Sequence, residues 1–261
     1  MPYADVNGQH LYYEDSGGDG PVVVFSHGLF MDTSMFEPQV QALRDRYRCI
    51  AWDERGHGRT GDATAPFTYW DSADDVVALL GSLGVERAVL AGMSQGGFLS
   101  LRAALRHPEL VRALILIDTQ AGVEDPERLP GYEAMVQQWL SAGPDQGMLD
   151  VIAGLILGEG YAGTPDWQAK WRTLSNDNLV QVFTTLATRD DLHDRLREIE
   201  IPAMVIHGEA DASISLEIGR NLADGLPNAE FVIVPDAGHA SNLTHPDAVN
   251  PQIERFLAGL S

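Results

Sequence analysis

The segment 90–97 constrains this chain most, because it places one serine between the end of one predicted element and the start of another. Residues 87–90 are short and apolar, as in a buried parallel strand, and residues 95–106 carry apolar side chains at helical spacing. Glycines two positions before and after Ser94 remove the Cβ clashes of a very sharp turn. This G-x-S-x-G pattern predicts a turn that lifts the Ser94 hydroxyl to the top of a sheet, although an ordinary flexible turn has the same short pattern.

Strands and helices alternate on both sides of this segment, which is typical of a parallel sheet with right-handed crossovers. An Asn-Gly pair at residues 7 and 8 predicts a hairpin that makes the sheet mixed. We therefore predict an α/β fold with a mostly parallel, eight-stranded sheet flanked by helices. The predicted strands span residues 3–6, 9–15, 22–25, 47–52, 87–90, 113–117, 203–206 and 231–234. The predicted core helices span residues 34–43, 71–83 (capped by Asp71 or Ser72), 95–106 and 216–226, with a last helix capped by Asn250 and opened by Pro251.

Residues 120–197 break this alternation and contain no convincing strand. The spacing of apolar residues predicts helices at about 132–140, 146–157, 167–174 and 178–186. We expect a core of residues 1–119 and 198–261, with residues 120–197 inserted after the sixth strand as a helical layer over the sheet. Most aromatic residues of the insertion are expected to form its own small core, and Trp139 and Trp167 are candidate substrate contacts.

The charge of the chain excludes some classes of partner. Its 17 Lys and Arg residues against 38 Asp and Glu residues give a formal net charge of −21. Such a surface argues against nucleic acids and anionic membranes and disfavours acidic substrates. The single Cys49 cannot form an internal disulfide and is expected to be buried. Without a secretory signal or an apolar run of about 18–20 residues, the chain is expected to be cytoplasmic; its oligomeric state stays open, with a homodimer through the insertion as one alternative.

Three residue types needed for nucleophilic acyl transfer follow three predicted strands. Ser94 follows one strand, Asp211 a later strand and His239 the last strand. Because ligands collect at the carboxyl ends of parallel strands, these side chains can converge although they are far apart in sequence. A serine hydroxyl needs a base to take its proton, a histidine can do this near neutral pH, and a carboxylate can orient the imidazole. The sequence therefore predicts a catalytic triad of Ser94, His239 and Asp211, with Gly238 allowing close approach of the histidine loop.

The same chemistry needs N–H donors for a developing oxyanion. We expect the backbone amide of Gln95, the first residue after the nucleophile, to be one donor. The second is expected from Leu29, with Phe30 as the alternative, in the loop that follows strand 22–25. His27 is expected to orient this loop through a hydrogen bond, and both His27 and Phe30 are candidate substrate contacts.

Taken together, these motifs resemble the α/β-hydrolase fold superfamily, and within it bacterial serine esterases, enol-lactonases and cofactor-free perhydrolases. The resemblance spans the whole chain and implies that the insertion is a helical lid. Epoxide hydrolases and haloalkane dehalogenases, which are relatives in this superfamily, have an aspartate nucleophile at the elbow. The serine at position 94 argues against those two activities for this chain. The matching segments are residues 26–28, 53–60, 92–97, 208–211 and 238–239.

Other polar residues have competing assignments. Asp118 also ends a strand and is the alternative acid to Asp211. Asp53 and Arg55 are expected to form a structural pair, and His57 is expected to lie in a structural turn. The histidines show no metal-ligand spacing, so we expect no metal and no cofactor.

The predicted activity is hydrolysis of a small hydrophobic carboxylic ester or lactone through a Ser94 acyl-enzyme. Perhydrolysis or acyl transfer would use the same residues with peroxide or an alcohol as the acceptor. Hydrolysis of a C–C bond in a ketone is a further alternative, and a small-ligand receptor built on a hydrolase scaffold is the alternative that is not an enzyme.

Overall fold

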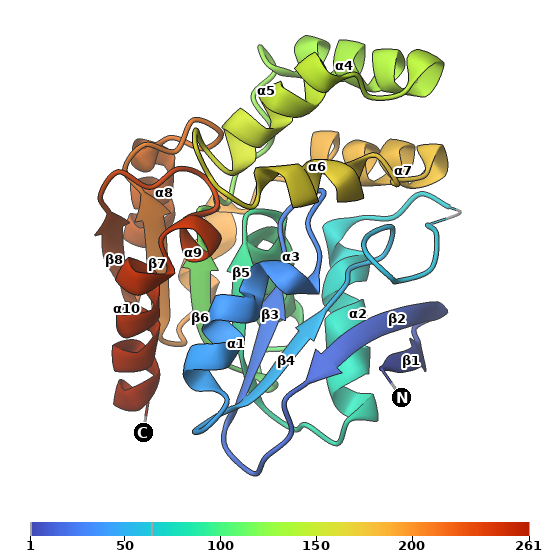
Figure 1. Cartoon of the computed structure of the whole chain (residues 1–261). Helices are drawn as coiled ribbons and strands as arrows, with labels where there is room; N and C mark the ends of the chain where they lie inside the picture. Colours follow the sequence, from blue (N-terminus) through green and yellow to red (C-terminus); the bar gives the residue numbers. More distant parts are fainter. Residues whose placement is uncertain (1, 64, 261) are drawn as a thin grey trace.

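The computed structural model describes residues 2–63 and 65–260, which form a single sheet with the strand order β1-β2-β4-β3-β5-β6-β7-β8 (Figure 1). The first three strands in this order pair antiparallel, and all later pairs are parallel. The predicted fold class is therefore confirmed. The strands are β1 (Tyr3–Val6), β2 (Gln9–Asp15), β3 (Val22–Ser26), β4 (Arg48–Trp52), β5 (Ala88–Met93), β6 (Val111–Ile117), β7 (Ala203–Gly208) and β8 (Ala229–Val234).

Helices cover both faces of the sheet because its central strands are apolar on both sides. Val23 and Phe25 of β3 face one apolar cluster, whereas Val24 between them faces the other. The first cluster includes residues of α1 (Glu37–Leu43) and α10 (Pro246–Gly259), and the second includes residues of α2 (Tyr69–Ser82), α3 (Gln95–Arg106) and α8 (Leu216–Gly225). The sheet is therefore the middle layer of a three-layer core.

The helical insertion lies above the carboxyl ends of the parallel strands (Figure 1). Its helices are α4 (Leu129–Ala142), α5 (Gln146–Ile156), α6 (Thr164–Trp171) and α7 (Asn176–Ala187). Trp139 and Trp167 are buried in the same apolar cluster as the sheet residues Val23 and Phe25. Their packing is therefore shared with the core, which corrects the expectation of a separate core within the insertion.

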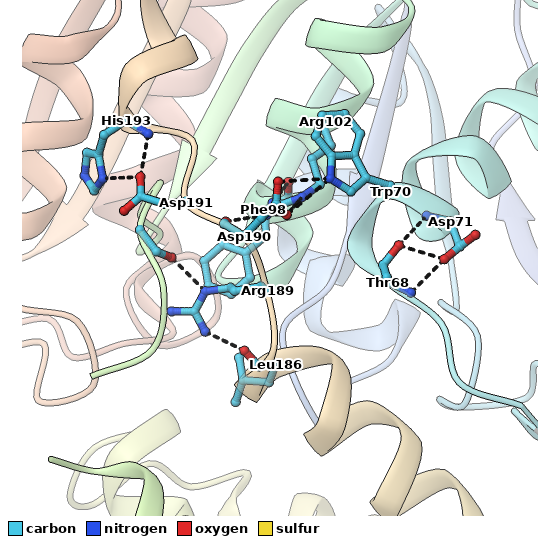
Figure 2. A network of polar contacts seen from close by, with 11 residues as sticks. Thr68, Trp70, Asp71, Phe98, Arg102, Leu186, Arg189, Asp190, Asp191 and His193 are labelled. Atoms are coloured by element: carbon cyan, nitrogen blue, oxygen red, sulfur yellow. Dashed lines mark hydrogen bonds and ion pairs between the residues drawn. The ribbon is translucent and has the colours of Figure 1, made fainter. Parts of the chain in front are cut away.

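The predicted N-terminal caps of two helices are wrong. Thr68, not Asp71 or Ser72, caps α2, and it forms a reciprocal capping box with Asp71 (Figure 2). The last helix begins at Pro246, so that Pro251 lies inside it. Asn250 does not cap this helix; its side chain instead contacts Gln39. The structure also adds two short 3₁₀ helices, η1 (Thr33–Phe36) and η2 (His193–Glu198), and a short helix, α9 (Ser241–Thr244).

No helix in the described part of the chain is both long enough and apolar enough to cross a membrane. Cys49 is buried within β4, as expected, and burial raises the pKa of its thiol to about 12.

The end of β7 and the loop after β8 meet in a contact that excludes a side chain. A Cβ atom on Gly208, the last residue of β7, would lie 2.3 Å from the carbonyl oxygen of Gly238. A Cβ atom on Gly238 would meet nothing closer than 3.9 Å. Gly208, rather than the predicted Gly238, therefore allows the close approach of the histidine loop.

We predict that Gly208→Ala lowers the free energy of unfolding by about 3 kcal/mol, because the backbone must shift to admit the methyl group. Gly154→Ala is the control, since this glycine lies in α5 with nothing within 4 Å of an added Cβ atom. The control should be neutral or stabilising by about 0.5–1 kcal/mol. Urea unfolding measures both, and equal stabilities of the two variants would contradict the assignment.

Candidate functional site

Ser94 lies at the tight junction between β5 and α3, as the elbow pattern predicts. Its backbone has φ 50° and ψ −114°, a conformation that residues other than glycine rarely adopt. A Cβ atom on Gly92 would lie 2.1 Å from the carbonyl oxygen of Gly96, and one on Gly96 would lie 2.0 Å from that of Ser26. Both glycines are therefore required for the turn to pack against the end of β3.

The three residues of the predicted triad form a continuous hydrogen-bonded chain. The Nε2 atom of His239 lies 3.1 Å from the Oγ atom of Ser94. The Nδ1 atom of His239 lies 2.8 Å from Oδ2 of Asp211. The loops after β5, β7 and β8 supply these side chains, and all three lie at the same edge of the sheet. The arrangement can pass a proton from the hydroxyl to the imidazole while the carboxylate holds the imidazole in place.

Asp211 is buried but remains suited to carry a negative charge. Burial opposes its ionisation, but His239, His207 and the amide of Ile214 outweigh this effect and hold the pKa of the carboxyl below its usual range. Its Oδ1 atom accepts hydrogen bonds from the amides of Ser213 and Ile214 at 2.8 and 2.9 Å. The loop after β7 therefore preorganises the acid.

A second buried histidine, His207, lies beside Asp211, and no motif in the sequence predicts it there. Its Nε2 atom donates to the carbonyl oxygen of Ile214 at 2.8 Å and lies 3.3 Å from Oδ2 of Asp211. Its position at the end of β7, four residues before Asp211, is the only signal the sequence carries, and that position also fits an ordinary buried strand residue.

The alternative acid, Asp118, does not contact His239. Its two carboxylate oxygens accept hydrogen bonds from the amides of Gly208 and Ser241, at 2.7 and 2.9 Å. Burial and the neighbouring charge of Asp211 raise the pKa of Asp118 to about 6. Asp118 therefore ties the end of β7 and the segment after His239 to the end of β6 rather than orienting the imidazole.

Asp118, His207 and Asp211 are also the one group of potential metal ligands that converge in the described residues. One ligand atom from each lies within 4.8 Å of the others. All three side chains are buried and already hydrogen-bonded to the protein, and Asp211 is engaged by His239. The donor set therefore serves the hydrogen-bond network, and we assign it no metal.

The loop after β3 is braced on both sides. The Nδ1 atom of His27 donates to the carbonyl oxygen of Gly28 at 2.8 Å, while Nε2 accepts from the amide of Glu54 at 3.0 Å. The indole N–H of Trp171, from the lid helix α6, donates to the carbonyl oxygen of Phe30 at 2.9 Å. Phe30 has φ 62°, so the loop turns sharply at this residue. The bracing role predicted for His27 agrees with this geometry.

The backbone amides of Leu29 and Gln95 are the predicted oxyanion donors. Within residues 2–63 and 65–260, neither amide donates a hydrogen bond to the protein. Gln95 is the first residue of α3, where the helix dipole adds a partial positive charge. Their role stays a prediction that these free donors support.

A mostly apolar cavity of about 120 Å³ adjoins Ser94 and His239. Core loops contribute Leu29 and Phe30 to its wall, and the lid contributes residues of α4, α5 and α7. Its lining includes the polar residues Gln120, Glu124, Tyr132 and Ser213.

Of the four predicted substrate contacts, Phe30 lines this cavity and the other three do not. His27 is fully buried in the bracing network described above. The ring of Trp139 packs against Phe30 at a centroid distance of 5.9 Å, and Lys170 lies over the ring of Trp167. The structure therefore gives no support to His27, Trp139 and Trp167 as substrate contacts, and that assignment stays a prediction.

The predicted pair of Asp53 and Arg55 does not form. Arg55 instead makes a two-pronged ion pair with Asp75 of α2, with both contacts at 2.6 Å. Asp53 accepts hydrogen bonds from the amides of Thr33 and Arg59, each at 2.7 Å. Both residues still brace the loop after β4, but through different partners that lie far from each other in sequence.

His57 lies in a turn of this loop, as predicted, and is buried behind the elbow. Its Nε2 atom lies 3.4 Å from the side-chain amide of Gln95, and Nδ1 lies 3.1 Å from the carbonyl oxygen of Arg55. Burial, with the nearby His27, lowers the pKa of His57 to about 3. The folded protein therefore holds this imidazole neutral.

We predict that His57 makes the fold less stable in acid. Between pH 6.5 and 3 the unfolded chain binds a proton that the folded chain excludes, so the free energy of unfolding falls as the pH falls. Going from pH 6.5 to 4.5, the wild type should lose about 2 kcal/mol more than His57→Gln. Urea unfolding at both pH values measures the difference, and parallel pH profiles would contradict the prediction.

Comparisons with known proteins agree with this geometry. A family model described as "alpha/beta hydrolase fold" matches residues 21–153, and one described as "TAP-like protein" matches residues 174–260.

RutD of Caulobacter sp. (strain K31), named as a proposed carbamate hydrolase, is 31% identical over 95% of this chain and 96% of its own. An enol-lactonase structure from Burkholderia xenovorans LB400 is similar with a TM-score of 0.90 and 28% identity, covering 98% of this chain and 100% of that one. An esterase structure from Thermogutta terrifontis has a TM-score of 0.88 and 26% identity, covering 97% and 94%. The chain belongs to the α/β-hydrolase fold family and is a hydrolase.

Proposed function

We propose that this hydrolase cleaves a small carboxylic ester or lactone through an acyl-enzyme on Ser94. The observation that carries the proposal is the unbroken chain from Ser94 through His239 to Asp211, which adjoins an apolar cavity. Each link is at hydrogen-bond distance, and the nucleophile is only 8% exposed. A substrate carbonyl held in this cavity would meet the hydroxyl away from bulk water.

The first half of the reaction forms the acyl-enzyme. His239 takes the Ser94 proton as the oxygen attacks the carbonyl carbon, and the charge of Asp211 stabilises the imidazolium. The amides of Gln95 and Leu29 donate to the developing oxyanion, each contributing about 3 kcal/mol of transition-state stabilisation. His239 then gives its proton to the leaving alkoxide as the C–O bond breaks.

Water completes the cycle by the same route in reverse. His239 takes a proton from the water as it attacks the acyl carbon, and Ser94 leaves with that proton restored. For a lactone, the alcohol and acid parts of the product stay in one molecule.

The named activities of relatives support acyl chemistry and widen the choice of substrate. Among the similar structures, one is named an enol-lactonase and another an esterase. A relative from Mesorhizobium japonicum, 28% identical over 92% of this chain and 89% of its own, is named 2-(acetamidomethylene)succinate hydrolase. The substrate panel should therefore include carbamates and amides beside esters and lactones.

We predict that Ser94→Ala lowers kcat for an activated ester at least 10³-fold, because the hydroxyl that His239 activates for acyl-enzyme formation is lost. Asp211→Asn should lower kcat about 10⁴-fold near neutral pH, because the amide disfavours the required imidazole tautomer. Steady-state assays and labelling by a serine-directed phosphonate measure these losses.

Ester turnover retained by Ser94→Ala would contradict the mechanism. A single-turnover burst in the wild type, followed by negligible steady-state turnover, would instead favour the ligand-receptor alternative.

We also predict that the lid helix α6 positions the oxyanion loop. Trp171→Phe removes the hydrogen bond to the Phe30 carbonyl, so kcat should fall about tenfold with little change in KM. Lys170→Gln is the control on the same helix: it loses the contacts of the half-exposed ammonium with Asp32, Ser34 and the Trp167 ring but keeps the hydrogen bond to the Phe30 carbonyl, so kcat should stay within about twofold. Equal effects of the two variants would mean that the indole contact does not position the loop.

A further inference from the structure

Glu124 is the one acidic residue among the described residues that line the cavity beside Ser94. Among the described residues that line the cavity, His239 is the one basic residue. Glu124 follows β6 and lies between the core and the first lid helix. Its side chain is 12% exposed, so most of its surface is covered by protein.

Arg189 holds this carboxylate in place from behind. Its Nη1 atom lies 2.9 Å from Oε2 of Glu124 and also donates to the carbonyl oxygen of Leu186, while Nε donates to that of Gly122. The guanidinium also lies over the ring of Phe98, at 4.5 Å from its centroid (Figure 2). The side chain of Arg189 is only 1% exposed. Arg189 is thus fixed by the fold, and it fixes Glu124.

The two charges of this pair are not equally available to a ligand. Glu124 lines the cavity, whereas Arg189 is not among the described residues that line it. A ligand therefore meets the negative member first, in a chain whose formal net charge is −21. In a poorly solvated cavity, a second carboxylate beside Glu124 is repelled, and the described lining residues include no Lys or Arg that could neutralise it.

We propose that Glu124, held by Arg189, is a specificity-determining residue that selects uncharged acyl groups and rejects those that carry a carboxylate. The inference rests on the proposed hydrolysis at Ser94. The remaining lone pairs of Glu124 accept a hydrogen bond from a hydroxyl or amide N–H on a neutral substrate. The substrate class is thus a neutral ester or lactone, with tolerance for a hydrogen-bond donor near Glu124.

The test compares two substrates that differ in charge. The 4-nitrophenyl ester of adipic acid carries a free terminal carboxylate, and its methyl-capped form is neutral with the same chain. For the wild type, kcat/KM should be at least tenfold higher for the neutral ester. This ratio needs no variant, so it tests the inference even if substitutions impair folding.

Glu124→Gln should reduce this ratio to less than threefold, because kcat/KM for the carboxylate-bearing ester rises once the negative charge of Glu124 is removed. The new amide can still accept the hydrogen bond from Arg189. Glu133→Gln is the matched control, because it removes one negative charge from an exposed site on α4 outside the cavity. It should leave the ratio unchanged.

Equal use of both esters by the wild type would overturn the inference, as would an unchanged ratio in Glu124→Gln or the same change in Glu133→Gln. These outcomes leave the hydrolase proposal standing. Failure of the wild type to hydrolyse either ester above the level of Ser94→Ala would instead overturn the proposed function, and this inference with it.

Discussion

The close approach of three backbone segments around Ser94 is the constraint on which the rest of the site depends. The serine keeps an unfavourable positive φ because Gly92, Gly96 and the end of β3 pack so tightly that no relaxed turn fits. Such strain costs about 1–3 kcal/mol and persists only where the surrounding structure over-determines it. Here the same packing aims the hydroxyl at His239 and starts α3 directly behind it.

The buried carboxylates of the site are stabilised by a hydrogen-bond network that is larger than the predicted triad. Asp211 lies between His239 and His207, while Asp118 uses both oxygens to hold the backbone of β7 and of the histidine loop. A buried carboxylate is costly unless it is paired or hydrogen-bonded. Two carboxylates at one sheet edge are tolerated because each has its own set of donors. One of them is left to orient the imidazole.

The lid is joined to the core at the points that shape the cavity. Trp171 of α6 donates to the loop after β3, and Asn178 of α7 accepts from the amide of Ala63 in the loop after β4. Glu124 and Arg189 pair across the two ends of the insertion. The lid therefore holds both the loop that carries the predicted oxyanion donor Leu29 and the cavity-lining Glu124.

The sequence by itself determined the sheet, the elbow and the three residues of the hydrogen-bonded chain, because hydrophobic period, turn glycines and strand ends are local signals. It correctly placed α3 at residues 95–106. Only the tertiary structure decided that Arg55 pairs with Asp75, that His207 supports Asp211, and that Glu124 rather than Trp139 or Trp167 faces the cavity. These contacts join side chains that are far apart in the sequence and lie on different elements, and no local sequence pattern encodes which of them come together. The partner of a buried charge is determined by the tertiary structure, whereas the conformation of a tight turn is determined by the few residues that form it.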